Sequence, residues 1–209
     1  AQGRSISFDG ALAGSEKVIG VDVARFGSDR TVFFSRWGKQ ALPPIVIEQA
    51  DLMHTVGLLT QLIDRWKPDA TFIDEGGVGG GVIDRCRQIG FDVVGVNFGA
   101  RAIDPRYFNR RAEMWFAMRD WLQDGGILPD DPALLADLSA PQFSFDAGNR
   151  LKLEPKDQIK KRMGKSTDLG DGLALTFAFP VMPAGRSAHG HGFTQTQHSF
   201  DPFEEAFHA

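Results

Sequence analysis

The sequence predicts a single α/β domain built on a mixed β-sheet with helices on its faces. Near the N-terminus, three short apolar segments follow one another with brief connections, as in an antiparallel meander. Further along, helix-like and strand-like segments alternate, which indicates parallel strands joined by crossover helices. The 209 residues are enough to bury one well-formed core.

The antiparallel part of the sheet is expected at residues 17–48. A first strand at about Lys17–Val23 and a second at about Thr31–Trp37 flank the polar, glycine-containing turn ARFGSDR, which predicts a β-hairpin. Two prolines then interrupt the chain before a third strand at Ile45–Glu48. Because the links are short, we expect these strands to pair antiparallel.

The parallel part is expected at residues 54–96. Apolar side chains at spacings of three and four predict a helix at His54–Trp66. A strand at Ala70–Asp74, a helix at Val82–Ile89 and a strand at Phe91–Val96 follow. We interpret the intervening EGGVGGG as a flexible turn, because no phosphate-binding G-x-G-x-x-G spacing fits it.

The second half of the chain is predicted to add helices and one hairpin. Residues 1–15 are small and polar and predict a linker or arm, whereas residues 181–209 have no periodicity and predict a flexible tail. The domain itself is therefore expected at residues 16–180. Its later elements are a helix at Asn109–Gln123, a short helix at Ala133–Ser139, a hairpin of Gln142–Phe145 and Arg150–Glu154, a basic helix at Lys156–Met163 and an apolar helix at Asp168–Phe179.

The composition excludes several classes of protein. No apolar stretch approaches the length of a membrane span, and the N-terminus lacks the pattern of a signal peptide. The single cysteine, Cys86, excludes an internal disulfide and a cysteine-based zinc site. The net charge of −4 argues against a protein that coats nucleic acid nonspecifically. Basic residues nevertheless gather at residues 150–165, where they form either a solvated face or a DNA contact.

Acidic residues occupy comparable positions in three of the expected elements. Asp22 lies in the first strand, Asp74 ends the fourth, and Asp168 and Asp171 open the last helix. An acid in a buried strand costs free energy unless it is paired or holds a metal ion. We expect the first and fourth strands to be neighbours, so that their acids lie side by side and the helix supplies a third.

Bound divalent ions would explain such a group of acids. Clustered carboxylates repel one another unless a cation lies among them, and oxygen ligands suit Mg²⁺ or Mn²⁺. Two such ions about 3.5–4 Å apart can activate water for phosphodiester cleavage. The alternatives are an ion pair of Asp22 with Arg25 and a simple helix cap for Asp168. For the acid at the end of the fourth strand, the adjoining Glu75 is an alternative ligand to Asp74.

The order of these elements and acids is that of the ribonuclease H-like nuclease fold. Three blocks, GVDVARFGSDRTV, FIDEGGVGGGVIDRCRQIG and KLEPKDQIKKRMGKSTDLGDGLAL, carry a closer resemblance. Over residues 17–179 they look like the C-terminal nuclease domain of the large terminase subunit, the DNA-packaging motor of tailed bacteriophages. The chain departs from the family at Thr167, where a proline is common, and at Gly172, where an alanine is usual.

The resemblance implies a metal-dependent endonuclease that cuts concatemeric double-stranded DNA with two bound ions. It implies that Asp22, Asp74 and Asp168 are the metal ligands. Asp171 takes the position of a fourth acid, and which of the two helix acids is the main ligand stays open. Asp29 resembles an auxiliary acid of the first hairpin.

Several basic residues are expected near the DNA. Lys156 falls where the family has a basic residue beside the scissile phosphate, and Arg25 is a counter-charge for the acids or a phosphate contact. The remaining candidates come from the basic run and from the loop before the long helix: Lys160, Lys161, Arg162, Lys165 and Arg101.

The resemblance also implies partners and leaves rival interpretations. The expected partners are double-stranded DNA, the ATPase domain of the same terminase, the small terminase subunit and the portal, in the cytoplasm of the infected bacterium. The chain carries no ATPase motif, so we expect it to be the nuclease domain alone. The rivals are a Holliday-junction resolvase or ribonuclease H-type nuclease, and a non-catalytic packaging module that docks on the portal or procapsid. An actin-like sugar kinase is disfavoured, because Ala24 stands where its phosphate loop needs glycine.

Overall fold

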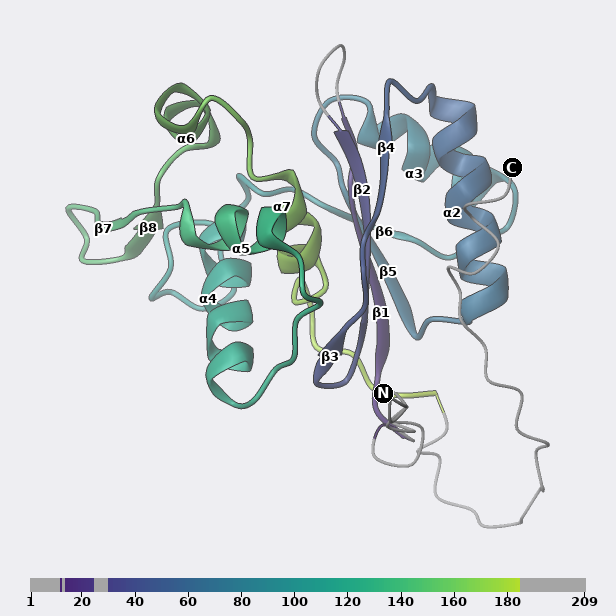
Figure 1. Ribbon diagram of the computed structural model, residues 1–209, viewed down its shortest axis with the longest axis horizontal. Coiled ribbons are helices and arrows are strands. Elements are labelled where there is room, and N and C mark those ends of the chain that lie inside the picture. The colour runs from purple at the N-terminus through teal and green to yellow at the C-terminus, as the bar shows by residue number, and fades with distance from the viewer. Residues whose placement is uncertain (1–11, 13, 25–29, 185–209) are drawn as a thin grey trace, which may run out of the picture.

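The computed structural model describes residues 12, 14–24 and 30–184, and its centre is a mixed sheet with helices on both faces (Figure 1). The sheet has six strands in the order β3-β2-β1-β5-β6, with β4 also paired to β2. The predicted fold class is confirmed. The strands are β1 (Lys17–Asp22), β2 (Arg30–Trp37), β3 (Gln40–Ala41), β4 (Ile45–Glu48), β5 (Ala70–Asp74) and β6 (Val94–Val96).

The strand directions agree with the prediction from connection lengths. β2 pairs antiparallel with β1 and β4, whereas β5 pairs parallel with β1 and β6. The two-residue strand β3 was not predicted, because so short a segment leaves no period to detect. In the register of β1 and β5, Val21 faces Ile73. Asp22 and Asp74, the next residues, therefore end neighbouring strands at the same edge of the sheet.

One face of the sheet is covered by α2 (Leu52–Trp66) and α3 (Gly79–Gln88) (Figure 1). Helix α2 begins where the Asp51 side chain accepts a hydrogen bond from the backbone N–H of His54. It ends at Lys67 in the left-handed conformation, one residue before the proline. Alternate residues of β1 point into this layer, and Ile19 and Val21 pack there against α2 and α3.

The opposite face is covered by α4 (Arg110–Gln123), α5 (Pro132–Ser139) and α7 (Asp168–Leu175). Helix α7 lies directly against β1. A Cβ atom on Gly20 would lie 2.3 Å from the carbonyl oxygen of Gly172, so only glycine permits this approach. The helix is shorter than predicted. The carbonyl of Thr176 accepts a hydrogen bond from Arg36, and the chain continues in tight turns instead of helix.

A hairpin and a short helix project from the α4 side of the molecule (Figure 1). The predicted hairpin is present as β7 (Phe143–Phe145) and β8 (Leu151–Leu153), followed by α6 (Lys156–Met163) at its predicted bounds. Leu151 and Leu153 of the hairpin pack on Tyr107 and Phe116, which anchors the hairpin to α4.

The predicted linker at residues 1–15 and tail at residues 181–209 lie almost entirely outside the described residues. At the described start of the tail, Val181 packs against the core. The backbone N–H of Ala184 donates to Asp69, which also accepts from the N–H of Lys17. Among the described residues, no helix combines the length and apolar character needed to cross a membrane.

Candidate active site

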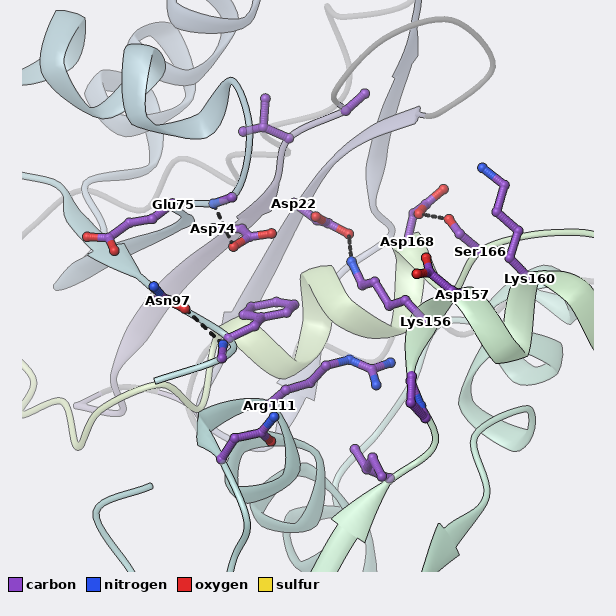
Figure 2. A pocket seen from close by; sticks show the side chains of 18 of the residues that line it. Asp22, Asp74, Glu75, Asn97, Arg111, Lys156, Asp157, Lys160, Ser166 and Asp168 are labelled. Carbon is purple, nitrogen blue, oxygen red and sulfur yellow. Dashed lines mark hydrogen bonds and ion pairs between the residues drawn. The ribbon is translucent and has the colours of Figure 1, made fainter. Parts of the chain in front are cut away.

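The strand ends that carry Asp22 and Asp74 open onto a cavity of about 790 Å³ (Figure 2). Its other walls come from the loop before α4, from the β7–β8 hairpin, from α6 and from the start of α7. Acidic and basic side chains share this lining. The acids are Asp22, Asp74, Glu75, Asp157 and Asp168, and the bases are Arg30, Arg111, Lys152, Lys156 and Lys160.

Asp22 is the buried acid at the centre of the site. Only 5% of the residue is exposed, and its Oδ2 lies 3.2 Å from the ammonium of Lys156. Burial raises the pKa of Asp22 to about 7, and Lys156 opposes that rise. The charges of Asp171, Asp74 and Asp168 each add to it. Repulsion among these acids therefore makes Asp22 a position that a further cation would stabilise.

Asp74 lies beside Asp22 and is held by the turn that follows β5. Its Oδ1 accepts a hydrogen bond from the backbone N–H of Gly76 at 3.0 Å. Gly79, the first residue of α3, allows the helix to begin close to the strand, because a Cβ atom there would lie 1.8 Å from the carbonyl oxygen of Asp74. Figure 2 shows Asp74 directed toward Asp22, whereas Glu75 points away from it.

Asp168 is the first residue of α7 and brings a third carboxylate to the cavity. It is 9% exposed, and its Oδ1 accepts a hydrogen bond from the hydroxyl of Ser166. Arg30, at the start of β2, lies 3.8 Å from the other oxygen. Asp168 thus has one close donor and one distant cation among its described contacts, and faces the same space as Asp22 (Figure 2).

Asp171, also in the first turn of α7, is fully buried and is not part of the cavity lining. Burial would raise its pKa, but the charges of Arg111 and Lys156, with hydrogen bonds from Trp115 and Arg111, lower it to about 2. Its Oδ1 accepts from Arg111 at 3.0 Å and from Trp115 at 2.7 Å. Its Oδ2 accepts from the hydroxyl of Thr167 at 2.8 Å and lies 3.2 Å from Lys156.

Lys156 lies between two acids. Its ammonium is 3.2 Å from both Asp22 and Asp171, and it lies 5.2 Å from the centre of the Phe98 ring. Burial would lower the pKa of Lys156, but the charges of Asp171 and Asp22 outweigh burial and raise it above its ordinary value. Among the described residues, no three acid, histidine or cysteine side chains are grouped closely enough to hold a metal ion.

Comparison with known proteins finds the same fold in several solved structures. No protein-family model and no curated protein matches the chain. A variant of the large terminase subunit of bacteriophage Sf6, solved with calcium, matches with a TM-score of 0.67 and 18% identity, over 83% of this chain and 94% of that one. The chain has the fold of a large terminase nuclease domain.

Two further terminase nuclease domains share this fold. That of the thermophilic phage G20c matches with a TM-score of 0.61 and 14% identity, over 79% of this chain and 83% of that one. That of Thermus phage P74-26 matches with a TM-score of 0.58 and 13% identity, over 78% of each chain. The resemblance seen in the sequence is therefore confirmed for the fold.

The predicted basic residues separate into two groups. Lys156 and Lys160 line the cavity, whereas Arg101 and Lys161 are exposed and do not. Arg162 and Lys165 also lie outside the lining, since Arg162 pairs with Glu154 and Lys165 with the buried Asp137 at 2.8 Å. Arg25 and Asp29 lie outside the described residues.

Some residues of the site were not predicted. Arg30 lies beside Asp168, and Trp115 donates its indole N–H to Asp171. Arg111 and Trp115 are one turn apart on α4 and both are buried. A buried arginine needs a buried acid opposite it, so an arginine among apolar helix residues is a signal for such an acid.

Proposed function

We propose that this protein is a metal-dependent endonuclease that cuts double-stranded DNA in the packaging of a phage genome. The observation that carries the proposal is the convergence of Asp22, Asp74 and Asp168, from two strand ends and a helix start, on one cavity with basic walls. The shared fold with terminase nuclease domains supports it. By the same analogy, we propose the terminase ATPase domain, the small subunit and the portal as its partners.

We propose that Asp22, Asp74 and Asp168 hold two Mg²⁺ or Mn²⁺ ions. An all-oxygen, carboxylate-rich set suits these hard cations. Structures of the Sf6 nuclease contain manganese, and those of the G20c nuclease contain magnesium or cobalt. Bound ions of this kind activate a water molecule and stabilise the leaving oxygen of a phosphodiester.

The ammonium of Lys156 must move away from Asp22 before these three acids can bind metal. A cation placed at Asp22 repels an ammonium group 3.2 Å from the same carboxylate. The side chain of Lys156 is 32% exposed, so the ammonium has solvent and cavity space into which it can turn. We propose that it then contacts a DNA phosphate beside the reacting bond.

Asp171 has a different role in this proposal. Its two oxygens already accept from Arg111, Trp115 and Thr167, and the residue has no exposed surface. We assign it to anchoring Lys156 and Arg111 from behind the site. Glu75, which lines the cavity, and Asp29 are auxiliary acids in the proposal.

Metal-dependent cleavage is the direct test. The purified protein is expected to nick and linearise supercoiled plasmid in Mn²⁺ or Mg²⁺ and to leave it intact when EDTA is added. Gel electrophoresis of the products measures this. Cleavage in excess EDTA, or none with any divalent ion, would contradict the proposal. Preferential cleavage of four-way junctions or of RNA–DNA hybrids would favour a resolvase or a ribonuclease H.

The basic walls of the cavity are proposed to bind the DNA backbone. Arg30, Lys152 and Lys160 surround the acids, and the ammonium of Lys152 lies over the ring of Phe108 at 5.1 Å. Contacts to phosphate neutralise charge and position the duplex without reading its sequence. We therefore expect binding that depends strongly on salt and little on base sequence.

Replacing Lys160 tests this wall. Lys160→Ala is expected to weaken binding of a labelled duplex and to reduce the slope of log K against log salt concentration by about 0.9, the loss of one phosphate contact. Fluorescence anisotropy in EDTA at several salt concentrations measures both. The adjacent Lys161, which is exposed but does not line the cavity, is the matched control. An equal loss in Lys161→Ala would show that only the overall charge matters.

A further inference from the structure

Helix α7, which carries Asp168, begins without a side-chain cap from its own sequence. Thr167 precedes the helix but makes no capping hydrogen bond. Its hydroxyl instead donates to Asp171 at 2.8 Å. The first N–H groups of a helix have no intrahelical acceptor, and leaving them unpaired in a buried place is costly. Because every residue from Asp168 to Leu175 is buried, the acceptor must come from elsewhere in the protein.

Asp137, on helix α5, supplies that acceptor. Its Oδ2 accepts a hydrogen bond from the backbone N–H of Leu169 at 3.1 Å, and its Oδ1 accepts from the ammonium of Lys165 at 2.8 Å. The residue has no exposed surface and does not line the cavity. The carboxylate of Asp137 therefore bonds to Lys165, which precedes Asp168 in the chain, and to Leu169, which follows it.

A carboxylate is well suited to this place. The N-terminus of a helix carries a partial positive charge that stabilises an anion, and hydrogen bonds to an ionised acceptor are stronger than neutral ones. Burying a carboxylate without partners would cost free energy, and here both oxygens have a donor.

The first turn of α7 is also fixed by close packing. A Cβ atom on Gly170 would lie 2.6 Å from the ring of Trp115 and 3.7 Å from the carbonyl oxygen of Asp137. The turn therefore lies directly against α4 and α5 on one side, while Asp168 faces the cavity on the other. A small shift of α7 would move the Asp168 carboxylate relative to Asp22 and Asp74.

We propose that Asp137 is a positioning residue that holds the first turn of α7 so that Asp168 completes the metal-binding set. This rests on the proposed metal-dependent function. Asp137 touches neither the metal nor the DNA. It acts through the backbone of Leu169 and through Lys165, which assigns Lys165 to this clamp and not to DNA.

Calorimetric titration of the protein with Mn²⁺, without DNA, tests the proposal. Asp137→Ala is expected to weaken Mn²⁺ binding ~10- to 100-fold, the usual effect of removing a group that orients a metal ligand. Asp137→Asn keeps an acceptor for the Leu169 N–H but loses the negative charge that pairs with Lys165. It is expected to bind Mn²⁺ several-fold more weakly than the unmodified protein, a smaller loss than in Asp137→Ala.

Asp131→Ala is the matched control. Asp131 caps α5 by accepting from the N–H of Ala133 at 2.8 Å, on the same helix but at the end without contact to Leu169. Losing this cap is expected to lower the melting temperature and to leave the Mn²⁺ affinity within about 2-fold of the unmodified protein. A purely structural role for Asp137 would make the two variants behave alike.

The outcomes separate the two proposals. If the unmodified protein binds Mn²⁺ and folded Asp137→Ala binds it with the same affinity, the role of Asp137 is overturned and the proposed function is not. No Mn²⁺ binding by the unmodified protein overturns the proposed function and this inference with it. If circular dichroism shows that Asp137→Ala does not fold, Asp137→Asn is compared with Asp131→Asn. Affinity lower by several-fold only in Asp137→Asn supports the proposal, and equal affinities overturn it.

Discussion

Replacing Asp22 with asparagine is expected to abolish metal-dependent DNA cleavage. The amide keeps the size of the side chain but removes the negative charge on which a divalent ion depends. We expect a fall in kcat on the order of 10³-fold, which corresponds to ~4 kcal/mol of activation free energy. Plasmid nicking in Mn²⁺, followed over time, measures the rate. Asp84→Asn, the same change on the exposed side of α3, is the control and should cleave normally.

The stability of Asp22→Asn distinguishes a lost site from a lost fold. The pKa of Asp22 is raised from 3.8 to about 7 in the folded protein. Ionisation of Asp22 therefore opposes folding increasingly as the pH rises from about 4 to 7. Asparagine does not ionise, so the metal-free variant should be at least as stable as the unmodified protein at pH 8. Urea unfolding in EDTA measures this. Full Mn²⁺-dependent cleavage by the folded variant would refute the proposed mechanism.

The sequence alone could place Asp22 and Asp74 together, because their position depends on strand order and direction. Short links predict antiparallel neighbours, and a crossover helix predicts a parallel one. With the strands assigned, the two acids had to meet at one edge of the sheet. Which basic residues of the run at 150–165 line the cavity was partly predictable from helix geometry. Lys156 and Lys160 are four residues apart on a helix and share a face, whereas Lys165 follows the left-handed Gly164 and turns elsewhere.

The sequence could not separate the roles of Asp168 and Asp171. Both lie in the first turn of the same helix, and local spacing does not say which of them meets a donor from a distant element. Arg111 and Trp115, more than fifty residues earlier, make that choice when α4 packs on α7. The role proposed for Asp137 likewise depends on the packing of α5 on α7. Contacts of this kind are set by tertiary structure, and local spacing does not identify the partner.

Replacing Asp171 with alanine is expected to destabilise the protein far more than replacing Asp168. Asp171 is the buried partner of Arg111, whose side chain is only 8% exposed. Removing one member of a buried ion pair leaves the other charge unpaired and costs ~3–5 kcal/mol. The indole N–H of Trp115 also loses its acceptor. Urea unfolding in EDTA at pH 8 measures the free energy of unfolding of each variant.

Asp168→Ala should lower the free energy of unfolding by less than about 1 kcal/mol in the same measurement. Its partner Arg30 lies 3.8 Å away, and the charge of Asp168 repels Asp22. The pKa of Asp171 is lowered from 3.8 to about 2, so the stability that it contributes is present above about pH 4 and lost as the pH falls toward 2. The difference in free energy of unfolding between the unmodified protein and Asp171→Ala should therefore narrow over that range.

Replacing both members of the buried ion pair, as in Asp171→Leu with Arg111→Met, should restore much of the stability, because apolar side chains leave no buried charge. Equal losses in Asp168→Ala and Asp171→Ala would mean that Asp171 is no more an anchor than Asp168, and would return it to the candidate metal ligands.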